Sequence, residues 1–600
     1  MSAHRYRITP KDPAAHLFEV SLTVDAPDSE GQVIAMPAWI PGSYMIRDYA
    51  KHVVAVRAES DGVAVALEKL DKSRWQAAPC ERPLTIVAEI YAYDPSVRGA
   101  HLDTTHAYFN GPCVFLSVVG QEGVSCELEI QAPEEPVGKD WRVATSMRRK
   151  EAEQYGFGLY VADEYAELID HPVEIGQLLI GEFEVNGIPH AIAIRGQARV
   201  DIARLCHDLQ RVCAQQMKLL GAPADLDRYL FLLHAPGNGY GGLEHRWSSS
   251  LVCGRDNLPI RADADISDDY RTFLGLVSHE YFHLWNVKRM KPAAFSPYDL
   301  STESHTGLLW VFEGITSYYD DLALVRSGLI SPESYLELLG QTITRVLRGS
   351  GRHRQSIEES SFDAWTKFYK QDANATNAIV SYYAKGSLVA LVVDLKIRSE
   401  TEGRVSLDDV MKECWNRWGE SADGMPERGL ERVCAELSGL DLSDFFDATV
   451  RGTGELPLQA MLAGVGVTFS LRRASSRKDK GGKASKKDPG PSLGATLVEK
   501  AGKSVFATVM NGGPAEAAGV APGDVAVALD GLALTAANCD RRLRTYRDGD
   551  SLELVVFRGD ELMSTEICLA NAPQNTCFLA LDGDADAMAI AQQAAWLQSD

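Results

Sequence analysis

The sequence predicts a multidomain α+β protein with a β-rich N-terminal part, a mainly helical middle part and a small mixed domain near the C-terminus. Three observations support this prediction. The chain has 600 residues, which is too long for a single hydrophobic core. Short runs of alternating apolar and polar residues fill the first 175 residues. From about residue 200 onward, longer runs with helical periodicity take their place.

The composition is that of an ordinary globular protein and argues against nucleic acid as a partner. Apolar residues make up 45% of the chain and charged residues 24%, with a net charge of −23. This acidic balance repels nucleic acid and weakly favours cationic ligands such as a peptide amine. No run of about eighteen apolar residues predicts a membrane span, and no apolar leader follows Met1. The eleven cysteines lack the spacing of a disulfide framework. We therefore expect a cytoplasmic protein, or a periplasmic one if the chain is a processed form.

Residues 1–175 are expected to form a β-sandwich-like domain. Alternating runs such as 16–24 and 84–93 are separated by Pro, Gly, Asp and Asn, which is typical of short strands joined by turns. The segment Pro37–Tyr44 contains two prolines and a glycine, so we expect a loop there and not a central strand.

Residues 176–460 are expected to form one domain that begins with strands and continues with helices. The patterns predict strands at 177–180, 191–194 and 229–234, and helices near 200–220 and at 407–418. The stretch Gly237–His245 is dense in glycine, which lets a backbone approach a ligand closely. A flexible loop is the other interpretation of that stretch.

An H-E-x-x-H motif at His279–His283 is the first chemical signal in this domain. Positions four apart lie on one face of a helix, so His279 and His283 can both bind one metal ion. Glu280 then lies close enough to take a proton from a water on that ion. The alternative is a chance match in which both histidines are ordinary core residues.

A second signal lies in the helix that follows the motif helix. The motif helix is expected to begin at Ser267 or Asp268, and the next helix to run from Thr306 to Val325. Glu313 lies in that second helix among aromatic and apolar residues, so its carboxylate is expected to point inward at a cost. A metal ion would satisfy it as the third protein ligand of a catalytic zinc site. The alternative is a core carboxylate paired with an arginine.

The stretch 472–490 is basic and of low complexity. Between 472 and 488 it has eight Lys or Arg residues against two Asp residues. Binding of an acidic partner is one interpretation. A solvated, disordered loop is the preferred one, because such a composition buries too little apolar surface to fold.

The rest of the segment 461–580 is strongly similar to a PDZ domain. The pattern Gly513-Pro514 to Gly523-Asp524 predicts a short helix and then a turn into a strand, between strands expected at 505–509 and 552–557. A PDZ domain would accept a peptide C-terminus or strand at its sheet edge. A purely structural PDZ domain is the alternative. Residues 581–600 are expected to form a tail with a short helix.

Four separated segments together resemble one family. His279–Trp285, Phe312–Gly314 and Tyr383–Gly386 are similar to segments of the gluzincin aminopeptidases related to aminopeptidase N. Gly241–His245 resembles the Gly-x-Met-Glu-Asn loop of that group. With the β-rich N-terminal part, the segment Trp39–Tyr44 and a C-terminal PDZ domain, the chain is most similar to the glycyl aminopeptidase family of zinc metallopeptidases.

The resemblance implies a thermolysin-like catalytic domain that binds one Zn²⁺ per chain. It implies that the zinc ligands are His279, His283 and Glu313. Glu280 would be the general base, and Tyr383 would donate a hydrogen bond to the tetrahedral intermediate.

The resemblance also implies a substrate-binding segment formed by Gly241, Gly242, Glu244 and His245, in which Glu244 binds the free α-amine. The sequence departs from aminopeptidase N in two respects, the residues around the amine pocket and the spacing of the zinc ligands. Leu243 and His245 replace a Met and an Asn, so the amine pocket is expected to differ in shape. The gap between the second histidine and the glutamate ligand is also longer. Asp320 lies where the wider group keeps a carboxylate that orients a zinc-binding histidine.

These inferences leave three hypotheses. The preferred one is a zinc aminopeptidase that removes small N-terminal residues, glycine before alanine, from peptides with a free N-terminus. The second is a zinc endopeptidase to which the PDZ domain presents protein C-termini. The third is a catalytically silent PDZ scaffold that keeps a structural zinc, against which the intact Glu280 and Tyr383 argue.

Overall fold

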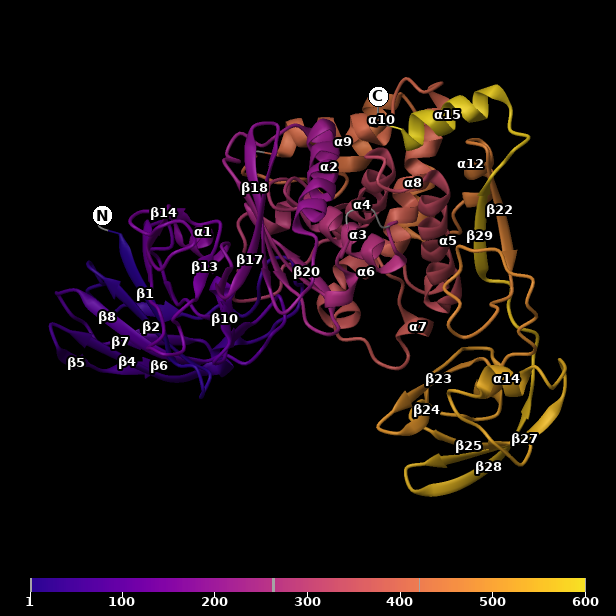
Figure 1. Ribbon diagram of the computed structural model, residues 1–600, viewed down its shortest axis with the longest axis horizontal. Coiled ribbons are helices and arrows are strands. Elements are labelled where there is room, and N and C mark those ends of the chain that lie inside the picture. The colour runs from indigo at the N-terminus through magenta and orange to yellow at the C-terminus, as the bar shows by residue number, and fades with distance from the viewer. Residues whose placement is uncertain (1–2, 262–264, 420, 599–600) are drawn as a thin grey trace. The chain divides into compact units, whose positions relative to one another are not determined.

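The computed structural model describes residues 3–261, 265–419 and 421–598. The chain forms two compact units. One unit comprises Met1–Ser304 and Trp415–Gly424, and the other comprises His305–Cys414 and Met425–Asp600. Strands dominate the first unit and helices most of the second, as Figure 1 shows. The predicted α+β organisation, with a sheet-rich N-terminal part and a helical middle part, is therefore correct. Residues 599 and 600 of the predicted tail lie outside the described residues.

Three sheets build the N-terminal part of the first unit. The eight-stranded sheet has the order β14 (Arg148–Arg149), β15 (Gly158–Ala162), β12 (Cys126–Ile130), β1 (His4–Asp12), β2 (Leu17–Val24), β8 (Leu84–Tyr91), β4 (Val53–Ser60), β5 (Val63–Val65). The two four-stranded sheets have the orders β13 (Arg142–Ala144), β16 (Val173–Gly176), β10 (His106–Phe109), β9 (Ala100–Leu102) and β11 (Ser117–Val118), β3 (Val33–Ala35), β7 (Arg74–Ala77), β6 (Leu67–Lys69).

One hydrophobic core joins these sheets. Strand β2 buries every second residue, as its alternating sequence predicts, and thereby places Phe18 and Leu22 in this core. Ile34 and Trp75 from another sheet and Phe109 from the third belong to the same cluster. The sequence therefore predicted the strands, while the packing of three sheets on one core came from the structure.

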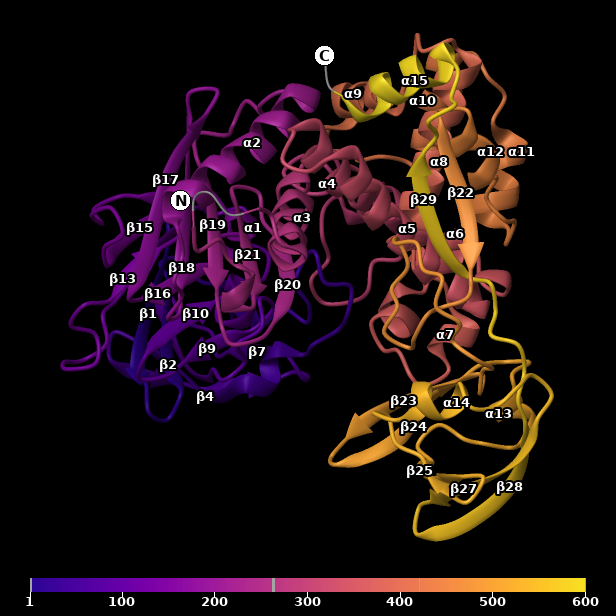
Figure 2. The ribbon, with the colours of Figure 1, turned by 45° about the vertical axis from the view of Figure 1, so that its right-hand side comes forward.

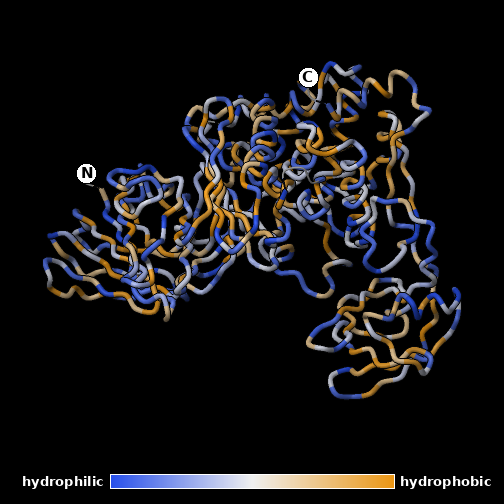
Figure 3. The backbone as a smooth tube through the Cα atoms, in the orientation of Figure 1, coloured by the Kyte–Doolittle hydropathy of each residue, from blue (hydrophilic) through white to orange (hydrophobic). Residues whose placement is uncertain are grey.

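A five-stranded sheet forms the other part of this unit. Its order is β17 (Leu178–Val185), β18 (Ile188–Arg195), β19 (Tyr229–His234), β21 (Ser248–Cys253), β20 (Tyr240–Glu244). The central strands β18, β19 and β21 are parallel, and β20 runs antiparallel at the edge. The tube in Figure 3 is mainly orange along these strands, as expected for strands buried on both faces. Helices α2 (Ile202–Leu220) and α3 (Asp268–Phe282) pack together, with α2 on β17 and α3 on β20 and β21.

The second unit is built mainly from helices around the buried helix α8. The helices are α4 (Ile315–Arg326), α5 (Pro332–Arg348), α6 (Ile357–Phe362), α7 (Ala375–Ala378), α8 (Ala384–Glu400), α9 (Leu407–Trp418), α10 (Gly429–Ser438), α11 (Ser443–Phe446) and α12 (Leu458–Ala463). Both α4 and α5 pack on α8, which is buried on all sides from Ala384 to Leu395. The helix predicted at 407–418 is confirmed.

A small domain is inserted into a two-stranded ribbon in this unit. Strands β22 (Val467–Arg472) and β29 (Thr576–Leu581) pair antiparallel and run side by side in Figure 2. Between them, the domain has the strand order β23 (Ala495–Lys500), β24 (Lys503–Val509), β25 (Val525–Leu529), β27 (Ser551–Arg558), β28 (Glu561–Cys568), with β26 (Leu532–Ala533) beside β25 and the helices α13 (Pro514–Ala517) and α14 (Cys539–Leu543).

Arg472 ends β22, and the rest of the basic stretch 472–490 has no helix or strand, as expected for a loop, but its first half is not simply solvated. Its arginines find acceptors within the chain. Arg472 pairs with Asp479 at 2.6 Å. Arg477 donates to the backbone oxygen of Leu497 at 2.6 Å and pairs with Asp540 at 2.9 Å. These contacts fix the first half of the stretch to the inserted domain.

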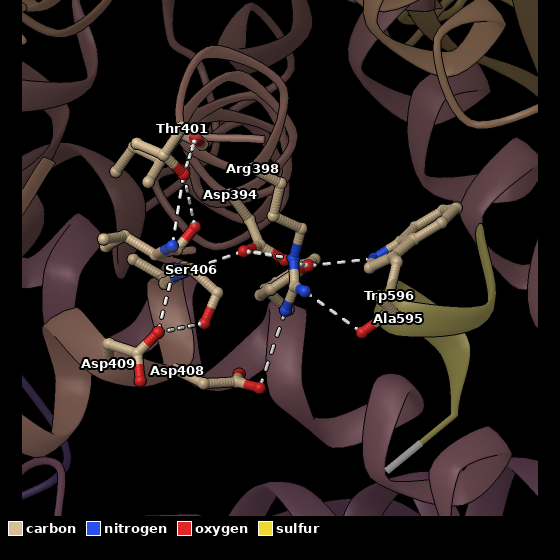
Figure 4. Close-up of polar contacts among 12 residues, drawn as sticks. Asp394, Arg398, Thr401, Ser406, Asp408, Asp409, Ala595 and Trp596 are labelled. Atoms are coloured by element: carbon tan, nitrogen blue, oxygen red, sulfur yellow. Dashed lines mark hydrogen bonds and ion pairs between the residues drawn. The ribbon is translucent and has the colours of Figure 1, made fainter. Parts of the chain in front are cut away.

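The tail contains the expected helix, α15 (Ala587–Leu597), and its end is anchored in the second unit (Figure 4). The indole of Trp596 is fully buried, and its Nε1 donates to the hydroxyl of Tyr318 at 3.0 Å. That hydroxyl donates to the buried carboxylate of Asp394 at 2.6 Å. Arg398 pairs with Asp394 and donates to the backbone oxygen of Ala595. The tail thereby binds side chains of both α4 and α8.

All eleven cysteines are free, as expected for scattered thiols. Cys206 and Cys213 are buried on α2, in agreement with the interpretation that they belong to the core. Among the described residues, the helices are too short or too polar to cross a membrane.

Candidate active site

Helix α3 carries His279, and His283 follows directly as its C-cap residue. The helix begins after Ser267, whose side-chain oxygen accepts a hydrogen bond from the backbone nitrogen of Tyr270, so the predicted start is confirmed. The rings of His279 and His283 lie 4.7 Å apart at an angle of 87°. The spacing of four residues therefore places the two imidazoles side by side at the C-terminal end of α3.

Buried polar contacts fix α3 in place. Gln216 of α2 donates through Nε2 to both the backbone oxygen and the hydroxyl of Ser278, each at 2.8 Å. On another side, the hydroxyl of Tyr281 lies 2.9 Å from Nε2 of His190, a strand residue that is 2% exposed. These contacts use side chains next to the motif, so they set the rotation of the helix that presents it.

One hydrogen bond sets the tautomer of His283. Its Nδ1 lies 2.7 Å from the backbone oxygen of Asn286, which can only accept. Nδ1 therefore carries a proton, and Nε2 is the ring nitrogen left for a metal ion. A histidine whose second nitrogen donates to a carbonyl in this way is typical of metal ligands.

The glycine-dense stretch forms the edge strand β20 over Tyr240–Glu244, so the interpretation as a flexible loop is wrong. Glycine disfavours strands, but here it permits close packing. A Cβ atom built on Gly242 would collide with the carboxylate of Glu280, whereas one on Gly241 would reach no nearer than 4.0 Å to Arg98. Gly242 therefore lets the strand lie against the candidate general base.

The same strand brings Glu244 to the motif. A ligand atom of Glu244 lies within 4.8 Å of ligand atoms of Glu280 and His283, and all three residues are buried. Glu244 is 3% exposed, and its Oε1 has no hydrogen-bond partner within the described part of the chain. A buried carboxylate oxygen without a donor is costly, so this position suits a ligand that brings one.

His245 lies in a buried ionic cluster. Its Nδ1 lies 3.0 Å from Asp170, which also pairs with Lys288 at 2.8 Å. Although burial raises the pKa of Asp170, the charge of Lys288 and the hydrogen bond from His245 outweigh it and hold that pKa well below its usual range. Burial lowers the pKa of His245, so the ring is neutral and Nδ1 donates. The ring thus anchors the end of β20.

Glu313 lies in the second unit, in a single widened helical turn that precedes α4. The turn, Trp310–Gly314, has π-helical hydrogen bonding, so the predicted continuous helix from Thr306 is wrong in its first part. Such turns occur often at functional sites, because they change the direction of one side chain. Glu313 is 2% exposed, which confirms its predicted inward position.

Tyr383 lies directly before α8 in the same unit. Its ring stacks on Phe368 at 5.6 Å and on Tyr382 at 4.7 Å. Its hydroxyl lies 3.4 Å from that of Tyr369. Because Tyr383 is half-buried, the stack fixes the ring while part of the side chain stays accessible.

Two glycines set the crossing between the segments that carry Glu313 and Tyr383. A Cβ atom on Gly314 would lie 2.7 Å from Cα of Gly386, closer than any side chain permits. The crossing therefore places the two candidate residues on helical segments in direct backbone contact. Asp320 lies further along α4 and is half-buried, and its Oδ1 accepts from the backbone nitrogen of Asp321.

Sequence reasoning missed two residues from the N-terminal sheets that reach β20. Arg98 donates through Nη2 to the backbone oxygen of Gly242 at 3.1 Å. Gly42, in the predicted loop, lies against the carboxylate of Glu244. Both are far from β20 in sequence and match no catalytic motif. The sequence drew attention only to the proline-rich loop that contains Gly42, and nothing in it pointed to Arg98.

Another group that could hold a metal ion lies outside this region and consists of His101, Asp103 and His106. The two rings are stacked at 4.4 Å with an angle of 18° between their planes. Ring-nitrogen lone pairs lie in the ring planes, so two stacked rings do not aim at one ion. Asp103 accepts from the backbone nitrogens of Thr105 and His106, as in a tight turn. The geometry favours a hydrogen-bonded turn.

Comparisons with known proteins agree with these features. The family model of the peptidase M61 N-terminal domain matches residues 5–177, and that of the M61 glycyl aminopeptidase matches residues 272–389. None of the curated proteins matches the chain.

Solved structures provide the second comparison. The crystal structure of an aminopeptidase N family protein from Idiomarina loihiensis is 39% identical, with a TM-score of 0.95, and the match covers 99% of this chain and 100% of that one. An M1 zinc metallopeptidase from Deinococcus radiodurans, bound to a Tyr-Ser-Ala substrate, is 14% identical with a TM-score of 0.45, over 76% of this chain and 95% of that one. On the two family models and the near-complete match to the Idiomarina protein, this chain is a peptidase that belongs to the M61 glycyl aminopeptidase family.

Proposed function

We propose that this protein is a zinc-dependent aminopeptidase that hydrolyses the first peptide bond of peptides with a free N-terminus. The observation that carries the proposal is the carboxylate of Glu244. It is buried, its Oε1 has no donor among the described residues, and it lies beside Glu280 and His283 of the motif. A substrate ammonium would supply the missing donors and a matching charge.

We propose His279, His283 and Glu313 as the ligands of one zinc ion per chain. The donor set of two imidazoles and one carboxylate is that of catalytic zinc sites. The tautomer of His283 supports it, since Nδ1 is engaged by a carbonyl and Nε2 is left for a metal ion. Asp320 is proposed to orient one of the histidines. Zinc in such a site polarises a carbonyl and acidifies a water molecule.

The chain's own residues then divide the reaction. Glu244 binds the ammonium and thereby presents the first peptide bond. Glu280 takes the proton of the attacking water and delivers it to the leaving amine. Tyr383 donates to the oxygen of the scissile carbonyl as negative charge develops on it. Gly241 and Gly242 are proposed to line the substrate at the edge strand β20, where Gly241 is half-buried and the backbone oxygen of Gly242 is engaged by Arg98.

Within this proposal, the preferred N-terminal residues are small, glycine before alanine. The name of the matching family supports this preference, and the protein is proposed to share it. His245 is proposed to act on the substrate side only through the end of β20, because its Nδ1 is engaged by Asp170.

Glu244→Gln tests the proposal most directly. The change keeps the shape but removes the charge, so we expect KM for glycyl-anilide to rise roughly 10- to 100-fold, as for a lost charged hydrogen bond. The wild type should hydrolyse glycyl-anilide far faster than N-acetylglycyl-anilide, and the variant should lose most of that difference. Equal rates for the two substrates in the wild type would contradict the aminopeptidase assignment.

A metal analysis of the same preparations completes the test. We expect one zinc per chain in the wild type and in Glu244→Gln, with activity lost on treatment with a chelator. Glu280→Gln should keep the zinc and lose hydrolysis. A zinc-loaded wild type without hydrolysis would favour the silent scaffold instead.

We propose that the inserted domain between β22 and β29 is a PDZ domain. Its sheet with β23 at one edge and its two short helices α13 and α14 support this, because a peptide would add as a strand at such an edge. The domain boundaries proposed are 1–175, 176–460 and 461–580. The alternative in which this domain guides an endopeptidase predicts that protein C-termini are bound at β23, next to Arg477.

A further inference from the structure

The loop Pro37–Tyr44 of the N-terminal sheets touches the candidate amine-binding carboxylate. Gly42 has a φ of +90°, a left-handed conformation that side chains rarely adopt. A Cβ atom built there would lie 2.5 Å from both carboxylate oxygens of Glu244. Two independent requirements, backbone conformation and space, therefore call for glycine at this position.

Aromatic contacts hold the loop against the segment that follows the motif helix. Trp39 is fully buried, and its Nε1 donates to the backbone oxygen of Asp299 at 2.8 Å. Its ring meets Tyr298 edge-on at 5.8 Å. Tyr44 stacks on Phe295 at 5.7 Å. The loop is thus tied on both sides of Gly42 to one segment of the same unit.

These anchors are needed because the loop is not packed solidly along its whole length. Ile40 and Pro41, directly before Gly42, line a cavity of about 1630 Å³. The position of Gly42 therefore depends on Trp39 and Tyr44 and on the backbone hydrogen bond from Ala38 to Leu300 at 2.7 Å. The loop therefore has a defined position although a cavity lies beside Ile40 and Pro41.

Arg98 provides a second contact from the N-terminal part to the same strand. Its guanidinium donates to the backbone oxygen of Gly242, two residues before Glu244. Its own backbone oxygen accepts from the hydroxyl of Tyr49 at 2.8 Å. The N-terminal part therefore contacts β20 both beside the general base and at the amine anchor.

We propose that Gly42 is a positioning residue that sets the depth of the amine pocket, an inference that rests on the proposed function. Its backbone covers one side of the Glu244 carboxylate and holds the two oxygens in place. An ammonium can approach only from the remaining side, and a peptide with further residues on the N-terminal side of the bound one meets the loop. The N-terminal part thus enforces cleavage at the first bond.

The alternative is that Gly42 is needed only to let the loop turn. Gly62 provides a matched control, because it has a φ of +77° in the same part of the chain and open space around its Cβ position. Gly62→Ala imposes the conformational strain alone. Gly42→Ala imposes that strain and also displaces the carboxylate.

The experiment compares kcat and KM of the two variants for glycyl-anilide and N-acetylglycyl-anilide. For Gly42→Ala we expect KM for glycyl-anilide to rise roughly 10-fold or more, since a charged hydrogen bond is misplaced, with a smaller change in kcat. The relative rate on the acetylated substrate should rise. Gly62→Ala should match the wild type in KM for glycyl-anilide and in the relative rate on the acetylated substrate. Both variants are expected to melt at slightly lower temperatures.

A rescue variant separates direct contact from general disturbance. In Gly42→Ala with Glu244→Asp, the shorter side chain withdraws the carboxylate from the added methyl group. We expect a KM well below the product of the two single effects, which is the signature of residues in contact. Multiplicative effects, or a Gly42→Ala variant that behaves like Gly62→Ala, would overturn the inference. If Glu244→Gln itself leaves the preference for free amines intact, the proposed function fails first, and the two failures are distinguishable.

Discussion

At the scale of single residues, the buried histidine His190 holds the helix that carries the H-E-x-x-H motif. His190 lies on β18, and its Nδ1 donates to the backbone oxygen of Ile188 at 2.9 Å. Its Nε2 therefore accepts from the hydroxyl of Tyr281, which belongs to the motif helix. The helix position is thus coupled to the protonation state of a residue that takes no part in the chemistry.

This coupling predicts acid sensitivity. Burial lowers the pKa of His190 to about 4, while an unfolded chain titrates near 6.5. The unfolded state therefore binds more protons between those values, so this contribution is complete above about pH 6.5 and is lost as the pH falls toward 4. Over that window we expect a loss of roughly 2–3 kcal/mol. The free energy of unfolding of His190→Gln should be lower than that of the wild type at pH 7.5, and it should change less with pH.

The measurement is urea unfolding at pH 7.5, 6 and 5. His207→Gln, an exposed change on α2, serves as the control and should follow the wild type at every pH. An unchanged slope in His190→Gln would show that other groups dominate the acid response.

At the scale of secondary-structure elements, the crossing of α4 and α8 determines where Glu313 and Tyr383 lie. Gly314→Ala places a methyl group 2.7 Å from Cα of Gly386 and 2.8 Å from the backbone oxygen of Tyr382. The helices must separate, so we expect a loss of about 1–3 kcal/mol and a lower kcat. Gly464→Ala is the control, because its Cβ would lie 3.4 Å from the nearest atom in a helical conformation. Thermal unfolding and kinetics of the pair check the expectation, and similar results for both would contradict it.

The terminal helix α15 is a second element whose contacts are expected to stabilise the helical unit. Trp596 donates to the hydroxyl of Tyr318 on α4, and Arg398 of α8 binds the backbone oxygen of Ala595. We expect Trp596→Ala to cost about 3–5 kcal/mol, as for other large buried side chains. Trp596→Phe should cost about 1 kcal/mol, since it loses mainly one hydrogen bond. Met588→Ala, at a position 74% exposed on the same helix, should be neutral in thermal unfolding. A neutral Trp596→Ala would show that the tail is dispensable.

At the scale of the whole molecule, the sequence predicted what depends on local patterns. The strand at Tyr229–His234 and the motif helix after Ser267 appear where periodicity and capping placed them. Glu313 was predicted to point inward from its apolar neighbours alone. Each of these depends on residues within a few turns of one another.

Features set by distant packing were not predictable in this way. Tyr240–Glu244 is rich in glycine and forms a strand only because β21 and α3 flank it. The turn at Trp310–Gly314 interrupts a pattern that reads as continuous helix. The contact of Gly42 with Glu244 joins residues about two hundred positions apart, and no local rule links them. The contacts of the basic stretch were not predicted because its acceptors, such as Asp540, lie in another segment.

The ribbon of β22 and β29 makes the inserted domain a detachable module. Arg472 pairs directly with Thr576, so both ends of the insertion leave the rest of the chain at one point. A chain in which residues 473–575 are replaced by Asn-Gly would close the ribbon with a two-residue hairpin turn. We expect it to fold and to hydrolyse glycyl-anilide within about threefold of the wild type, because insertions at such sites are energetically separable.

The excision would also remove two side-chain contacts between the module and the helices, the ion pair of Lys483 with Glu337 at 3.2 Å and the hydrogen bonds of Asn377. Asn377 lies six residues before Tyr383 in the chain. Its side-chain amide donates to the backbone oxygen of Val509 and accepts from the backbone nitrogen of Asn511. Because Asn377 is close to Tyr383 in the chain, we expect Asn377→Ala in the full-length protein to reproduce whatever kinetic change the excision causes. If excision changes kcat and Asn377→Ala does not, communication runs through the ribbon or through the pair of Lys483 and Glu337. In either case the paired ends of the ribbon would let another domain be inserted at the same point of the chain.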